Sequence, residues 1–248
     1  MTQMNYNEYH LSFFEYVIYG SVFFILLTIV AILFFNSVIP VILLSPLIIG
    51  YYNFVRRYLC EKRQNRLLYE FRDFINALSA SLNSGYSLEN AIKEAHKEMI
   101  ILYGSQAYMS MEADIMLKLL ALNIPVEKIF ADFAKRCQCT DIITFSQILI
   151  IAKRNGGDLI SIIKSSSATI SEKISLKGEI ATTIAAKQFE QNIMFVMPIA
   201  IMTYIRCMSK GYFNSIYQTP LGTVLMTVCL MVYILAIILG LKISKIKI

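Results

Sequence analysis

The chain has 248 residues, of which 56% are hydrophobic and 16% are charged, and its formal net charge is +6. A soluble domain of this length is rarely more than about half apolar, so the composition argues against a soluble enzyme and favours a membrane protein. The positive charge is mild and forms no basic stripe interleaved with aromatic residues, which argues against a partner made of nucleic acid.

Three long stretches contain no Asp, Glu, Lys or Arg, namely residues 16–55, 191–205 and 211–241. A helix needs roughly 20 apolar residues to cross a bilayer. The first stretch has room for two crossings, divided near Asn36 and Pro40, because both residues favour a turn there. We therefore predict two transmembrane hairpins, 17–55 and 191–241, with crossings at 17–35, 38–55, 191–206 and 220–241.

Lysine and arginine follow the first hairpin, over residues 56–66, and recur at the C-terminus, over residues 242–248. Basic residues near membrane ends mark the cytoplasmic side. We therefore predict a multi-pass protein of the cell (cytoplasmic) membrane. Its central domain, 56–190, and its basic tail, 242–248, face the cytoplasm, as does a short N-terminal tail, 1–16. Membrane lipid is expected beside the basic residues that follow the first hairpin.

Residues 56–190 carry ordinary helical periodicity, with Leu67, Phe71, Phe74 and Leu78 on one stripe of a helix. Three similar interruptions divide this region: "NSGYSLENAI", "LNIPVEKIF" and "NGGDLISII". No segment alternates like a strand. The predicted helices are 60–84, 87–102, 106–122, 125–137, 140–155 and one that runs from 158 into the third crossing.

Each interruption combines a helix stop with a helix start. In the first, Gly85 suits the left-handed conformation that ends a helix, and Ser87 suits the cap of the next one. In the second, Asn123 takes the place of glycine and Pro125 fits a first helical turn. The third interruption has two glycines and a capping aspartate, Gly156, Gly157 and Asp158.

Turns this short force neighbouring helices to pack together, which favours a closed bundle, although a solenoid of helical hairpins is an alternative. The expected fold class is an all-α polytopic membrane protein with four transmembrane helices. One cytosolic six-helix bundle is inserted between the two hairpins. Between residues 158 and 206 the only glycine is Gly178, and no proline precedes Pro198. This segment is either one unbroken helix or a helix with a flexible joint at Gly178.

Motifs for chemistry are missing: the sequence contains no Walker-type phosphate loop, no HExxH and no GxSxG. Cys137 and Cys139 are close in sequence, but zinc sites usually need four ligands, and the only histidines are His10 and His96. We therefore expect no catalytic residue, no metal and no cofactor, and a protein that is not an enzyme.

Glu190 lies at the edge of the third crossing. An acidic residue at such a position is a functional candidate. It either contacts another subunit or a translocated helix, or it forms an interfacial ion pair with Lys187 one turn earlier.

Five segments in order carry a resemblance: "EFRDFINALSASLNSGYSLENAI", "ALNIPVEKIFADFAKR", "ILIIAKRNGGDLISIIKSSSATISEK", "KQFEQNIMFVMPIAIMTYI" and "TPLG" before a final apolar helix. Together they resemble the type II secretion system protein F family, and are most similar to its tight-adherence (Tad/Flp) pilus branch. Many relatives have Gly at the position of Asn123. Larger members carry two copies of the bundle, whereas this chain has one, as Tad-type members do.

The resemblance implies an inner-membrane platform protein of a type IV pilus-like machine, which couples a cytosolic secretion ATPase to pilin assembly or export. The implied partners are that ATPase, pilins or pseudopilins, and a second platform subunit in a homodimer or heterodimer. The candidate partner-binding residues are Asp73, Gly85, Ser87, Gly156, Gly157, Asp158 and Glu190. The positions with a structural role are Asn123, Pro125 and Pro198.

Two other functions stay open at this point. The chain is alternatively a regulatory or scaffold membrane protein whose bundle binds another cytosolic partner. A small transporter or enzyme is a further alternative, although transporters normally show broken polar segments at corresponding places in two halves.

Overall fold

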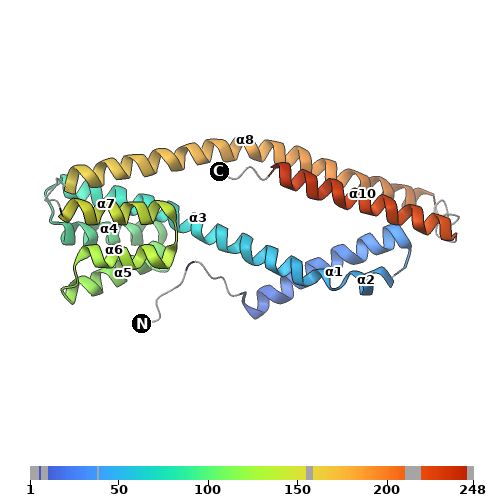
Figure 1. Cartoon of the computed structure of the whole chain (residues 1–248), viewed down its shortest axis with the longest axis horizontal. Helices are drawn as coiled ribbons and strands as arrows, with labels where there is room; N and C mark the ends of the chain where they lie inside the picture. Colours follow the sequence, from blue (N-terminus) through green and yellow to red (C-terminus); the bar gives the residue numbers. More distant parts are fainter. Residues whose placement is uncertain (1–5, 7–10, 38, 155–158, 210–218, 245–248) are drawn as a thin grey trace. The chain divides into compact units, whose positions relative to one another are not determined.

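The computed structural model describes residues 6, 11–37, 39–154, 159–209 and 219–244 (Figure 1). Every regular element in these ranges is an α-helix, so the predicted all-α class is confirmed. The helices are α1 (Phe13–Phe35), α2 (Ile39–Leu44), α3 (Leu47–Asn83), α4 (Leu88–Tyr103), α5 (Tyr108–Ala121), α6 (Val126–Cys137), α7 (Thr140–Arg154), α8 (Leu159–Met208) and α10 (Pro220–Ser244).

The chain divides into two compact units. The helical unit comprises residues 1–10 and 55–176, and the apolar unit comprises residues 11–54 and 177–248. Two helices, α3 and α8, each begin in one unit and end in the other. The polar and apolar parts of the chain are therefore joined twice by helical backbone.

The helical unit has a core of apolar side chains from α3 to α7 and from the first turns of α8. Helix α4 packs against α5, and α6 packs against α7, as Figure 1 shows at its left. Aromatic rings meet at the centre, where the Phe145 ring lies 5.6 Å from that of Phe71 and 5.5 Å from that of Phe130. Ile163, Ile170 and Ile174 bring α8 into this core. The stripe predicted on α3 is its largest contributor.

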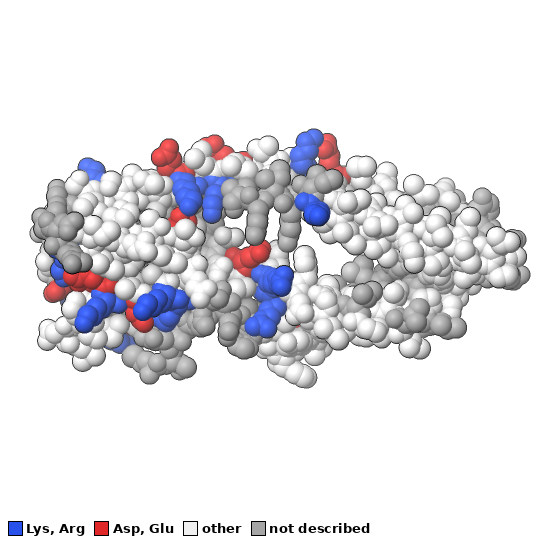
Figure 2. Space-filling model, in the orientation of Figure 1, with Lys and Arg blue, Asp and Glu red and all other residues white. Residues whose placement is uncertain are grey.

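The apolar unit has a smaller core, in which Leu33 and Phe34 of α1 meet Met226 and Leu230 of α10. Most other large apolar side chains of these helices are exposed. In Figure 2 the right-hand surface, formed by these helices, is almost free of charged atoms, whereas blue and red atoms are spread over the helical unit. A surface of this kind is stable in lipid rather than in water.

Three helices among the described residues are long and apolar enough to cross a membrane: Phe13–Phe35, Ile160–Met208 and Pro220–Lys242. They indicate a membrane protein. The prediction of four transmembrane helices is corrected to three, because no single helix covers the second predicted crossing, 38–55.

The break occurs between Leu44, the last residue of α2, and Leu47, the first of α3. Pro46 causes it, because proline has no N–H to donate and disfavours helical geometry at the residue before it. Helix α2 has only 6 residues, and only residues 47–55 of α3 precede the charge of Arg56. Neither piece alone is long enough to span.

Helix α8 settles the alternative at Gly178, because it is continuous over 50 residues from Leu159 to Met208. An added Cβ at Gly178 would meet no atom within 4 Å, so this glycine does not serve close packing. Pro198 lies inside the same helix without ending it.

Candidate functional site

The first two predicted turns have the expected backbone. Gly85 has φ +88° and Asn123 has φ +56°, so both residues adopt the left-handed conformation that ends a helix. The Ser87 hydroxyl accepts a 3.4 Å hydrogen bond from the backbone N–H of Asn90, as a helix cap does. Pro125 occupies the cap position itself, one residue before α6, rather than the first turn. These residues end and begin helices, and the Ser87 side chain is engaged in capping α4.

The third predicted turn, with Gly156, Gly157 and Asp158, lies outside the described residues. The exposed apolar side chain of the first turn is Tyr86, which is 50% exposed. Since Ser87 serves α4, Tyr86 is an exposed side chain of this turn that remains available to a partner.

Asp73 and Glu190 are both occupied by neighbouring side chains. The Asp73 carboxylate accepts a 2.7 Å hydrogen bond from Arg72 Nε and another from the Tyr103 hydroxyl of α4. Glu190 forms a 3.0 Å ion pair with Lys187, and its side chain is 70% exposed. The pair of Glu190 with Lys187 agrees with the ion-pair alternative for Glu190. The hydrogen bond between Asp73 and Tyr103 connects α3 to α4.

A well-connected polar group of the helical unit is one that sequence analysis missed, the carboxylate of Glu112 on α5. It is 1% exposed and receives two 2.7 Å hydrogen bonds from the guanidinium of Arg136 on α6. A third hydrogen bond comes from Tyr6, whose hydroxyl donates to Glu112 Oε1 over 2.9 Å. Bidentate and charge-assisted bonds of this kind are the strong ones in proteins.

Tyr6 is itself 1% exposed, and both its backbone and its ring contact the helical unit. The backbone N–H of Tyr6 donates to the Arg136 carbonyl over 3.2 Å, and Cys60 Sγ lies 3.6 Å from the Tyr6 carbonyl oxygen. The guanidinium of Arg63 lies 5.8 Å from its ring centre, and the Tyr108 ring meets it edge-on at 5.9 Å. Burial, followed by the charge of Glu112, raises the pKa of Tyr6. A residue of the N-terminal segment is therefore part of the helical unit.

A second buried acid, Glu70 on α3, completes the start of α5. It is 1% exposed, accepts a 2.8 Å hydrogen bond from the backbone N–H of Met109, and pairs with Arg66 Nε at 3.0 Å. The cap position of α5 is Ala107, whose side chain has no acceptor. Glu70 therefore supplies from another helix the bond that a local cap would make.

A signal for both acids was present in the sequence. Glu70 is three residues after Leu67 and four before Phe74, and Glu112 is three after Met109 and four before Met116. Each acid thus sits inside an apolar stripe, where a charge is buried only with a partner.

A groove of 430 Å³ lies between α7 and the first turns of α8. Among the described residues that line it, only Asp141 and Lys173 are charged, and an ion pair joins them to each other. The remaining lining consists of apolar and hydroxyl side chains, among them Thr144, Phe145, Ile148, Ile162, Ser166 and Thr169. A lining of this kind favours a molecule that packs against the groove by its shape, and it does not favour acid–base chemistry.

In the part of the chain that the structure describes, no three His, Cys, Asp or Glu side chains gather in one place. These residues therefore form no cluster that could hold a metal ion. Cys137 is fully buried, and burial raises the pKa of its thiol. A buried thiol of raised pKa is inert.

The apolar unit is held by polar contacts at sites of helix approach. Arg206 of α8 donates to the Ile32 carbonyl and to the Asn36 side chain at the end of α1. The Tyr233 hydroxyl of α10 donates to the Phe195 carbonyl, three residues before Pro198. Polar groups satisfied between helices are the usual means of tolerating proline and charge in a membrane helix.

No family model matches this chain, and no curated protein or solved structure matches it either.

Proposed function

We propose that this chain is a membrane platform subunit of a pilus-like assembly or secretion machine, in the type II secretion F family and its Tad/Flp branch. Its helical unit, a closed cytosolic bundle, receives work from a secretion ATPase and passes it to pilins or pseudopilins in the bilayer. The platform is completed by a second subunit, as a homodimer or heterodimer.

The observation that carries this proposal is the continuity of α8. Its first turns are fixed in the core of the helical unit by Ile163, Ile170 and Ile174, and the same helix continues through the apolar segment to Met208. In an α-helix every turn is hydrogen-bonded to the next. A displacement of the helical unit is therefore transmitted along α8, whereas a flexible joint would absorb it.

We further propose that the chain returns across the membrane after α1, through the broken segment formed by α2 and the start of α3. Within the apolar unit, Tyr52 lies back beside the first half of α1. Its hydroxyl donates to the Tyr16 carbonyl over 2.8 Å, and the two rings are 4.9 Å apart. The Phe23 and Tyr51 rings are 5.1 Å apart. Both contacts bring neighbouring tyrosines of α3 back against α1, which supports a return whose second arm is interrupted at Pro46.

The burial of Tyr6 supports the same topology. Tyr6 precedes α1 and belongs to the helical unit, and residue 55, after the hairpin, also belongs to it. Both ends of the hairpin then lie on one side of the bilayer. The lysines and arginines after residue 55 and at the C-terminus mark that side as the cytoplasm.

Capture of the ATPase by the full chain, purified in a mild detergent, tests the function. We expect the wild type to retain the hexameric secretion ATPase of the machine. Tyr86→Ser should weaken capture about tenfold, because exposed tyrosines are frequent interface anchors. Leu122→Ser is the matched control, since Leu122 is 71% exposed beside the second turn.

Undiminished capture by Tyr86→Ser would place the contact elsewhere on the helical unit, and equal loss in both variants would extend it over both turns. If the folded wild type retains no ATPase, the platform proposal is wrong. A regulatory or scaffold role with a different cytosolic partner would then take its place.

A further inference from the structure

The structure divides the basic residues after the first hairpin into two groups. Arg63 faces the Tyr6 ring at 5.8 Å, and Arg66 pairs with Glu70 at 3.0 Å, so both belong to the helical unit. The other members, Arg56, Arg57 and Lys62, are exposed. They form no ion pair with any carboxylate that the structure describes. We call these three residues the free basic collar.

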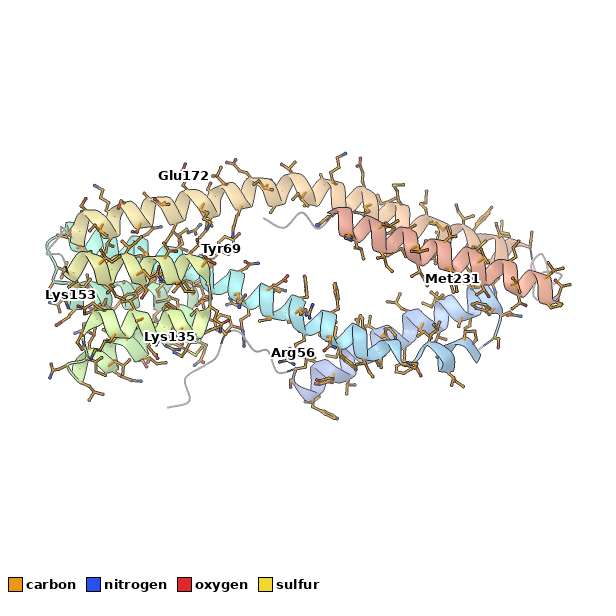
Figure 3. The ribbon with its side chains drawn as sticks, in the orientation of Figure 1. Arg56, Tyr69, Lys135, Lys153, Glu172 and Met231 are labelled. Atoms are coloured by element: carbon orange, nitrogen blue, oxygen red, sulfur yellow. The ribbon has the colours of Figure 1, made fainter. Side chains whose placement is uncertain are left out.

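The collar surrounds α3 rather than lying along one face. Successive residues of an α-helix are turned by about 100°, so Arg57 and Lys62 are rotated by about 100° and about 240° from Arg56. A helix that lies on a membrane surface keeps its cations on a single face. Cations on all sides within two turns instead suit a helix that passes through a layer of negative charge. Figure 3 labels Arg56 on α3.

Tyrosines precede the collar on the same helix. Tyr51 and Tyr52 lie about one turn before Arg56, and Tyr52 is fixed to α1 through its bond to the Tyr16 carbonyl. Tyr58, which is 58% exposed, lies between Arg57 and Lys62. Tyrosine is enriched where a membrane helix meets the headgroups. The order along α3 is therefore apolar, aromatic and basic, as at the boundary between lipid tails and headgroups.

We propose that Arg56, Arg57 and Lys62 bind the headgroups of anionic phospholipids. The guanidinium groups donate paired hydrogen bonds to phosphate oxygens, and the lysine adds a third cation. Glu61 is the only acid between residues 56 and 66, so the local charge stays positive. This inference rests on the proposed placement of residues before 55 in the bilayer, but not on the identity of the ATPase or of the pilins.

Native mass spectrometry of the full chain, freed of lipid in a neutral detergent and titrated with phosphatidylglycerol or phosphatidylcholine, tests the proposal. We expect the wild type to retain phosphatidylglycerol preferentially. Each charge removed should lower that preference about fivefold. Arg56→Gln, Arg57→Gln and Lys62→Gln together should abolish it. Soluble glycerol phosphate at equal concentration should not compete, because the bilayer-anchored lipid is the ligand.

Two control variants make the result specific. Lys93→Gln, Lys128→Gln and Lys135→Gln together remove the same charge from exposed positions of the helical unit and should leave the preference unchanged. Figure 3 labels Lys135 among them. Arg56→Lys with Arg57→Lys keeps the charge and should retain most of the preference. Circular dichroism shows whether each variant keeps its helices.

An unchanged lipid preference in the folded collar variant would overturn the proposal. So would a collar variant that loses ATPase capture but keeps its lipid, because the collar would then be a protein contact. If the wild type prefers phosphatidylglycerol but captures no ATPase, only the proposed function fails, and the lipid site stands.

Discussion

At the scale of single residues, the polar contacts of the helical unit depend on two buried acids. Glu112 is shared by Arg136 and Tyr6, and Glu70 by Arg66 and a backbone N–H. Ion pairs at the surface contribute little, whereas a buried charge that loses its partner is strongly destabilising. Removing the partner of either buried acid is therefore expected to destabilise the helical unit strongly.

Arg136→Met tests this view, because it leaves the Glu112 carboxylate buried without a cation. We expect the free energy of unfolding to fall by about 3–5 kcal/mol. Adding Glu112→Leu to Arg136→Met should recover part of this loss, since no charge then remains buried. Chemical denaturation followed by circular dichroism measures both. Lys118→Met, which breaks the exposed pair with Asp114, should change stability by less than about 1 kcal/mol.

Tyr103 gives the helical unit a dependence on alkaline pH. Burial, and the hydrogen bond that its hydroxyl donates to Asp73, raise the pKa of Tyr103 to about 12. Its proton is thus held more tightly in the folded state than in the unfolded state. The stabilisation is complete below the ordinary tyrosine pKa of about 10 and is lost as the pH rises toward 12.

Unfolding measured from neutral pH to pH of about 12 should show this loss in the wild type. Tyr103→Phe should show a smaller decline over the same window, because it has no proton to lose at that position. Equal declines in both proteins would show that other tyrosines dominate.

At the scale of elements, the helix ends are completed in two ways. Local residues do so at α4, where Ser87 caps the helix, and at the end of α5, where Asn123 adopts positive φ. At the start of α5 the acceptor instead comes from Glu70 of α3, because Ala107 has none. That helix start therefore depends on tertiary packing.

Glu70→Ala should uncap α5 and leave the Met109 N–H without its acceptor. We expect a loss of about 1–3 kcal/mol in the free energy of unfolding. Ala107→Ser, which adds a local cap, should recover about 1 kcal/mol in the Glu70→Ala background and much less in the wild type. Glu94→Ala, which removes an exposed pair with Lys97, is the control. Equal effects of Ala107→Ser in both backgrounds would contradict a capping role for Glu70.

At the scale of the whole molecule, the central question is how often the chain crosses the bilayer before α3 reaches the helical unit. Three continuous helices qualify as spans, yet the Tyr16–Tyr52 contact indicates that the interrupted segment returns beside α1. The placement of Tyr6 in the helical unit supports the return across the bilayer that we propose.

Oxidation of a Tyr6→Cys variant tests the topology, because Cys60 Sγ lies 3.6 Å from the backbone carbonyl of residue 6. We expect a disulfide between these positions, detected by peptide mapping, since the Cys60 thiol lies beside the backbone of residue 6. The same variant with Cys60→Ser should lose the product. Labelling of the Tyr6→Cys thiol in intact cells by a reagent confined to the exterior would refute the hairpin.

The sequence by itself determined the helical class, the apolar segments and the two turns at Gly85 and Asn123. These features depend on local hydrophobic period and on backbone conformation, which neighbouring residues decide. Pro46 lies inside the second predicted crossing, and the apolar pattern alone does not show that proline ends the helix there rather than kinking it. As a result the apolar pattern predicted one helix where the structure has two.

Only the tertiary structure decided where Tyr6 lies, which acids are buried, and which arginines pair with them. Glu112 and Arg136 are 24 residues apart, and Tyr6 is 106 residues from Glu112. No local sequence pattern identifies hydrogen-bond partners at such separations, because the partners depend on which helices pack against each other. The continuity of α8 past Gly178 was also open in the sequence, since glycine permits both a helix and a joint.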